Sequence, residues 1–183
     1  MSEPSSLYAR VHLSAPALRA FMESPLARPT AYSDWRGWLN RASFHGTIRD
    51  AEIAAMPTGA EPSVRAALAA LCRPLPYEPA QERYDPVTQT WTLAVLQFSE
   101  NYYDFIDILT IIRAIAAYKD LPGEDVILIY PFLWGGEPEV YLRVTAGASH
   151  FAPQVPGEMI AEADACFRRL CNEHTAGINP DAL

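Results

Sequence analysis

The chain has 183 residues, of which half are hydrophobic and a fifth charged, as expected for one globular domain spanning residues 1–183. This composition excludes a chain that is disordered throughout. Acidic residues exceed basic ones by 22 to 14, and the formal net charge of −8 argues against binding to a nucleic-acid backbone.

The N-terminus lacks the basic and apolar regions of a signal peptide. The longest apolar run is interrupted by Asp107 and Arg113, so it is too short and too charged to span a bilayer. The three cysteines have no spacing typical of a disulfide framework. We therefore expect a bacterial, cytoplasmic protein with no membrane association.

The N-terminal part predicts a strand followed by a short helix. Residues 7–13 alternate between apolar and polar side chains, which is the period of a half-buried strand. Ser14 is a suitable N-cap for a helix over residues 15–23. Residues 24–62 give no clear prediction apart from a short helix at 50–56.

Further along, Pro62-Ser63 opens a helix that continues to Cys72 with one apolar face. Residues 82–84 and 90–98 predict a hairpin with Asp85-Pro86 at its turn.

The strongest patterns lie between Thr90 and Ala146. Residues 91–98 and 126–134 are apolar on both faces, as in central strands. Residues 100–119, between them, predict a helix with one broad apolar face and Ser99 as N-cap. A strand, a crossover helix and a second strand predict a parallel β-α-β unit.

The turn Gly135-Gly136-Glu137-Pro138 predicts a tight hairpin leading into a third strand at residues 139–146. After a loop at 147–156, residues 157–173 predict the last helix. We therefore predict an α+β fold with a mixed β-sheet and helices mainly on one face. Its centre would be a ferredoxin-like β-α-β-β core, residues 90–146, with N-terminal and C-terminal additions.

No catalytic or metal-binding motif is recognisable in the chain. The histidines, His12, His45, His150 and His174, are scattered, and none has the spacing of a metal site or of a base with its orienting partner. Cys166, Cys171 and His174 lack an evident fourth ligand, so packing of the thiols in the core is favoured. We expect no catalytic residue, no metal and no cofactor.

Acidic and aromatic residues gather on the central helix and in the following turn. The predicted helix begins after the end of the first strand, and the turn follows the end of the second strand. In a parallel β-α-β unit these two strand ends lie at the same edge of the sheet, so the acidic and aromatic residues of the helix and of the turn should share that edge. Charged and aromatic side chains on one surface are typical of protein-binding sites. The predicted partner-binding residues are Glu100, Tyr103, Asp104, Asp107, Trp134, Glu137 and Glu139.

The resulting hypothesis is a non-enzymatic protein-binding domain. Its most concrete form is a bacterial immunity protein that inhibits a toxin domain with a basic surface, because acidity would steer that association. The alternative is an enzyme or small-molecule-binding protein with a pocket at the strand ends, near Tyr102, Tyr103, Trp134 and His150. A third interpretation is a homo-oligomeric module that associates through the Trp-rich segment 32–44.

Overall fold

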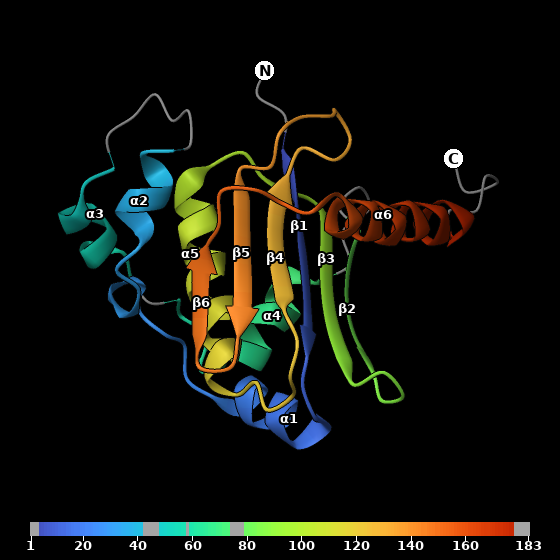
Figure 1. Ribbon diagram of the computed structural model, residues 1–183, viewed down its shortest axis with the longest axis horizontal. Helices are drawn as coiled ribbons and strands as arrows, with labels where there is room; N and C mark the ends of the chain where they lie inside the picture. The colour runs from blue at the N-terminus through green and yellow to red at the C-terminus, as the bar shows by residue number, and fades with distance from the viewer. Residues whose placement is uncertain (1–3, 42–47, 58, 74–78, 178–183) are drawn as a thin grey trace.

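A computed structural model describes residues 4–41, 48–57, 59–73 and 79–177 (Figure 1). The strands are β1 Ser5–His12, β2 Ala80–Asp85, β3 Thr90–Ser99, β4 Asp125–Tyr130, β5 Val140–Thr145 and β6 Ala148–Phe151. The helices are α1 Ala15–Glu23, α2 Trp35–Leu39, α3 Asp50–Ala55, α4 Val64–Leu71, α5 Tyr102–Arg113 and α6 Gly157–Gly177. Two 3-10 turns complete the elements, η1 Pro29–Ala31 and η2 Ala114–Ala117. The predicted α+β class is confirmed.

The sheet is six-stranded, with the order β2-β3-β1-β4-β5-β6, and every pair of neighbouring strands that is described is antiparallel. The predicted mixed sheet with a parallel β-α-β pair is therefore wrong. β3 and β4 do run in the same direction, but β1 lies between them and pairs with both. The apolar pattern of β3 and β4 showed that both strands are central, whereas it held no information on which strand lies beside them.

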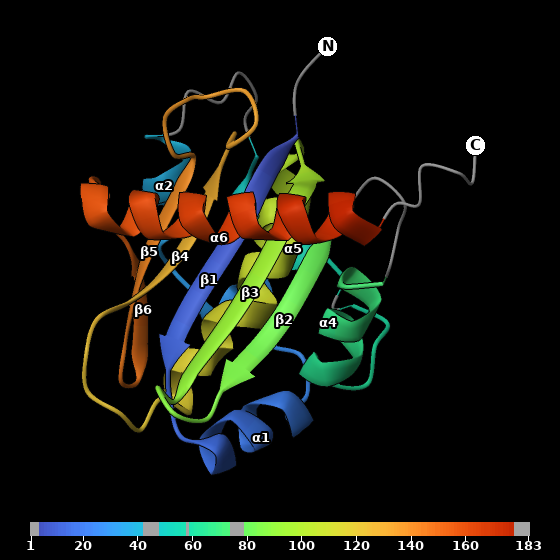
Figure 2. The same cartoon turned by 90° about the vertical axis from the view of Figure 1, so that its right-hand side faces the viewer.

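Helices cover both faces of the sheet (Figures 1 and 2). On one face, Leu7, Ala9 and Val11 of β1 belong to a large core with side chains of α1, α4 and α5. On the other face, α6 alone crosses the strands, and its Phe167 packs with Tyr8 in a second, smaller core. The expectation of helices mainly on one face thus holds for the helices other than α6. None of the helices within the described ranges is long and apolar enough to cross a membrane.

The connection between β4 and β5 differs from the predicted tight hairpin. β4 ends at Tyr130 rather than at Trp134, because Pro131 has no N–H to continue the ladder. The chain then turns back, and the N–H of Gly135 donates to the carbonyl of Pro131 at 2.8 Å. Gly135 has φ +73°, and a Cβ on Gly136 would lie 2.6 Å from Pro131 Cγ, so the two glycines build this loop rather than a strand-to-strand turn.

β6 was missed because its four residues lie in a segment predicted to be a loop. It pairs with β5 through a turn at Ala146-Gly147, where Gly147 has φ +79°. The predicted hairpin of β2 and β3 and the N-cap Ser14 are confirmed, and the helix predicted to open at Pro62-Ser63 has Ser63 as its N-cap. The N-cap of α5 is Asn101 instead of Ser99.

Candidate functional site

The register of β1 brings the end of β3 and the end of β4 to the same edge of the sheet. Ser5 lies opposite Ser99 of β3, and Ser6 lies opposite Tyr130 of β4. α5 begins just after Ser99 and the β4–β5 loop just after Tyr130, so both emerge at this edge (Figure 1). The predicted residues of the two segments are therefore on the same end of the sheet, although β1 separates the strands.

The first half of α5 carries an exposed stripe. Tyr103, Asp104 and Asp107 are all exposed, and the Oγ of Ser99 donates to Asp104 at 2.6 Å. Desolvation by surrounding atoms raises the pKa of Asp107, and the charge of Asp104 adds a smaller increase. The stripe ends at Asp107, because the residues from Ile108 to Arg113 are buried on all sides of the helix.

The β4–β5 loop contributes exposed apolar side chains. Trp134 is 55% exposed and Leu133 is 39% exposed, and Tyr103 of α5 is 41% exposed. Of the large hydrophobic side chains described as exposed, only Val87 lies elsewhere. Leu133 was not predicted, because the sequence pattern placed it inside a strand. We call the exposed set the edge surface; it consists of Glu100, Tyr103, Asp104, Asp107, Leu133, Trp134 and Glu137.

Glu139, the remaining predicted residue, differs from the others because it is half-buried. Its carboxylate accepts a hydrogen bond from the Oγ of Ser5 at 2.7 Å, and its backbone carbonyl accepts one from Trp38 Nε1 at 2.8 Å. Burial, followed by the charge and hydrogen bond of Glu139, raises the pKa of Tyr102 to about 12. Glu139 therefore ties the loop to β1, α2 and α5.

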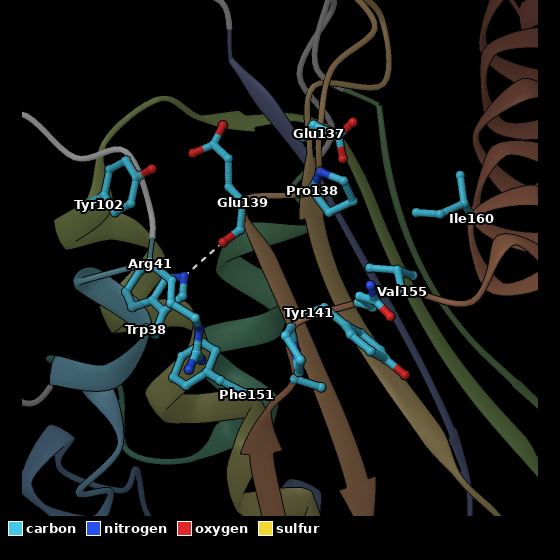
Figure 3. A pocket seen from close by; sticks show the side chains of 13 residues that line it. Trp38, Arg41, Tyr102, Glu137, Pro138, Glu139, Tyr141, Phe151, Val155 and Ile160 are labelled. Carbon is cyan, nitrogen blue, oxygen red and sulfur yellow. Dashed lines mark hydrogen bonds between the residues drawn. The ribbon is translucent and has the colours of Figure 1, made fainter.

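Beside Glu139 lies a cleft of about 690 Å³ (Figure 3). Trp38 forms one wall, stacked on Phe151 with ring centroids 5.0 Å apart and on Tyr102 at 5.5 Å. Figure 3 shows Ile160 on the opposite side, and Glu137 also lines the cleft. We call this cavity the edge cleft, since it opens where the edge surface ends.

Of the residues predicted to lie near a pocket, Tyr102 and His150 line two different cavities, and the linings described include neither Tyr103 nor Trp134. The described lining of the edge cleft contains Tyr102 but not His150. His150 instead lines a separate cavity of about 280 Å³ next to Arg113. The difference arises because β6 pairs with β5, which carries His150 away from the strand ends.

Arg113 holds the wall of the edge cleft in place. Its Nη2 donates to both carboxylate oxygens of Asp34, at 2.8 and 2.9 Å, and its Nε donates to Ser149 Oγ at 3.0 Å. Its guanidinium carbon lies 4.1 Å from the ring centre of Tyr32 and 4.9 Å from that of Trp35. Because Asp34 precedes α2, this partly buried contact fixes the helix that carries Trp38.

In the part of the chain that the structure describes, the histidines and cysteines do not gather into a site. The Nδ1 of His12 lies 2.5 Å from a carboxylate oxygen of Asp125, a residue 113 positions away, so this histidine does have a carboxylate partner, although none is evident from sequence spacing. The cysteines form no disulfide, and burial raises the pKa of the Cys166 thiol. Among the described residues, no group of three or more His, Cys, Asp or Glu side chains is placed to hold a metal ion. His45 lies outside the described residues.

No protein-family model, curated protein or solved structure matches this chain.

Proposed function

We propose that the protein is a non-enzymatic protein-binding domain whose edge surface contacts a partner with a basic surface. In its most concrete form it is a bacterial immunity protein that inhibits a toxin domain. We also propose the bacterial cytoplasm as its location, and a ferredoxin-like relationship of residues 90–146 stays a prediction.

The observation that carries this proposal is the exposure of Tyr103, Leu133 and Trp134 beside acidic side chains. Large apolar side chains lose contact with water when a partner covers them, and each buried one contributes about 1.5–3 kcal/mol. Trp and Tyr are also the residues most often found at the energetic centre of interfaces. Neighbouring carboxylates would steer a basic partner toward them.

The edge cleft adds a place for a basic side chain of the partner. The carboxylate of Glu137 lines the cleft together with the aromatic rings of Trp38 and Tyr102. A guanidinium or ammonium group is attracted both by a carboxylate and by the face of an aromatic ring. Arg41 lines the same cleft, so a partner arginine would have to displace or avoid its side chain.

Charge reversal on the edge surface tests the proposal. The wild-type chain, an Asp104→Lys/Asp107→Lys variant and a Glu173→Lys variant are immobilised and exposed to extract of the native cell. Glu173 is an exposed acid near the end of α6 and is not part of the edge surface, so its reversal is the control for net charge. We expect a basic protein that the wild type and Glu173→Lys retain and that the double variant loses.

The captured protein is then purified and tested for a toxic activity that the wild-type chain suppresses. If all three baits retain the same proteins, or if the double variant no longer folds by circular dichroism while Asp104→Lys alone folds and still binds, the edge surface is not the binding site.

A small-molecule ligand in the edge cleft is the second candidate, because the volume of the cleft falls in the range of about 300–1,000 Å³ that ligand pockets occupy. The two candidate functions predict different effects of substitutions in the edge cleft and on the edge surface. Glu137→Lys would abolish a ligand-induced rise in melting temperature, whereas Asp104→Lys would leave it unchanged. Loss of partner binding in Asp104→Lys supports the protein-binding proposal, whereas Glu137→Lys should weaken the binding of a protein partner and of a small molecule alike.

A further inference from the structure

The opposite end of β1 carries a polar cavity that the proposed function does not use. α6 crosses only part of β1, β2 and β3, and the remaining length of these strands stays uncovered (Figure 2). A cavity of about 480 Å³ lies there between the strands and α6. It is separate from the edge surface, so its test is independent of the test of partner binding.

Strand register gathers the polar side chains of this cavity. His12 lies opposite Thr90 and Arg10 opposite Thr92 between β1 and β3, and Arg83 of β2 also lies opposite Thr92. These side chains alternate with the residues of the large core, so they share the face that α6 partly covers. Arg169 of α6 completes the lining from above.

His12 is held in one orientation by buried charges. Asp125 is fully buried and accepts from the backbone N–H of His12 at 2.9 Å as well as contacting its Nδ1 at 2.5 Å. Its second partner is the ammonium of Lys119, which is also buried. Because Asp125 occupies the Nδ1 side of the ring, the geometry of imidazole directs Nε2 away from it. The side chain is 35% exposed and lines the cavity.

The cavity is locally basic on an acidic protein. Three arginines line it against two acids, Glu162 and Asp85. Glu162 is bound by Arg10 at 2.6 Å, and Asp85 accepts from the backbone N–H of Val87 at 2.8 Å. Within the described ranges, neither Arg83 nor Arg169 forms an ion pair.

Arg10 also has a buried Nε without a hydrogen-bond partner among the described residues. Buried donors without a partner are rare, and they mark places where a further acceptor would be favourable.

We propose that this cavity binds the phosphate group of a small, polar phosphorylated molecule of the sugar-phosphate class. Several N–H and O–H donors, with a net positive charge, suit a tetrahedral oxyanion, and guanidinium groups bind phosphate in pairs of hydrogen bonds. His12 Nε2 and the hydroxyl of Thr92 provide further polar contacts. The cavity is larger than a phosphate group needs, and its described lining holds no Phe, Tyr or Trp on which a nucleobase could stack.

The test is a titration of the full chain, followed by NMR, with inorganic phosphate, glucose 6-phosphate and glucose at constant ionic strength. We expect saturable shifts around His12 and Arg83 with both phosphates and none with glucose. Arg83→Ala, which changes an exposed side chain, should weaken binding at least tenfold, and His12→Gln should weaken it as well. Arg143→Ala on β5, outside the cavity, is the matched control and should bind like the wild type.

Three results would overturn the proposal. One is the absence of saturable binding of either phosphate to the wild type, and another is equal binding of glucose. The third is an affinity for phosphate that falls as much in Arg143→Ala as in Arg83→Ala, because that result would indicate attraction to surface charge in general. Since Arg83 is exposed, its variant keeps the test valid even if His12→Gln fails to fold.

Discussion

Asp125 shows how single residues far apart in sequence determine local structure. Its carboxylate contacts the ammonium of Lys119 and the ring of His12, and both Asp125 and Lys119 are buried. Two buried opposite charges compensate each other, whereas removing one leaves the other without a counter-charge. No sequence pattern predicts this contact, because His12 and Asp125 lie on different strands with no motif joining them.

We predict that Lys119→Met and Asp125→Asn each lower the free energy of unfolding by about 3–5 kcal/mol. The double variant should lose less than the sum, by at least about 1 kcal/mol, because neither unpaired charge remains. Urea unfolding of the four proteins measures this cycle. Arg36→Ala, which breaks an exposed ion pair with Asp50, is the control and should cost about 1 kcal/mol or less. Strict additivity would contradict the pairing.

Asp107 represents the opposite case, because its ionised carboxylate lowers the stability of the fold. Its folded-state pKa is raised, so the folded protein holds the proton more tightly than the unfolded chain does. Ionisation therefore destabilises the fold as the pH rises through the carboxylate range. We predict that Asp107→Asn is at least as stable as the wild type at pH 7, and that any gain disappears at acidic pH. Thermal unfolding across this pH range would show a loss of stability instead if Asp107 supported the fold.

The residues of the edge surface illustrate what a helical pattern can predict. The exposure of Tyr103, Asp104 and Asp107 followed from their place on the polar side of an amphipathic helix. The half-buried state of Glu139 did not, because Ser5 and Trp38 reach it from distant segments. Leu133 was missed for a related reason. An apolar residue within a predicted strand is expected to be buried, and the sequence did not show that the strand ends before it.

At the scale of elements, α6 is the only described helix that packs against the second face of the sheet. Phe167 is fully buried, with its ring centre 5.0 Å from that of Phe132 and 5.9 Å from that of Tyr130. The pattern of residues 157–173 predicted a helix, but not that it would cover the opposite side of the sheet from α5. Periodicity identifies which side of an element is buried, and it does not assign the layer against which that side packs.

Truncation of Phe167 tests this layer. Phe167→Ala should lower the free energy of unfolding by about 3–5 kcal/mol, the usual loss for a large aromatic side chain in a core. Arg168→Ala, at the neighbouring exposed position, should change it by about 0.5 kcal/mol or less. Chemical denaturation gives both values. Equal, small effects would mean that α6 is loosely attached.

At the scale of the whole molecule, the connectivity was the least predictable feature. Strand β1 and the segment 90–146 were each recognised as elements, yet β1 enters the sheet between β3 and β4. The length of the connection and the rules for crossovers favour β3 and β4 as adjacent parallel strands. They do not predict that a third strand lies between the two and pairs with both. The common edge of β3 and β4 was predicted correctly despite this, because the two strands still point the same way.

The buried tyrosines give a property of the whole fold that can be measured. Burial, helped by acceptors such as Glu162 and Asp164, raises the pKa of Tyr8 and Tyr130 above the ordinary value of 10.0, and that of Tyr102 to about 12. The unfolded chain therefore loses these protons at lower pH than the folded protein. Stability should be unaffected below about pH 10 and fall as the pH rises above it.

Tyrosinate absorbance and circular dichroism, followed together, check this prediction. Part of the tyrosine absorbance should develop only with the loss of secondary structure above about pH 10. Ionisation of all nine tyrosines near pH 10 with the fold intact would show that these hydroxyls are not buried.

The central claim is that the edge surface binds a basic partner, and the most direct measurement is the dissociation constant of the captured partner by calorimetry. Trp134→Ala should weaken binding by about 2 kcal/mol or more, roughly 30-fold, and Asp104→Lys by tenfold or more, with unchanged folding stability. Glu173→Lys should bind like the wild type. Equal affinities of Trp134→Ala, Asp104→Lys and Glu173→Lys would contradict the claim.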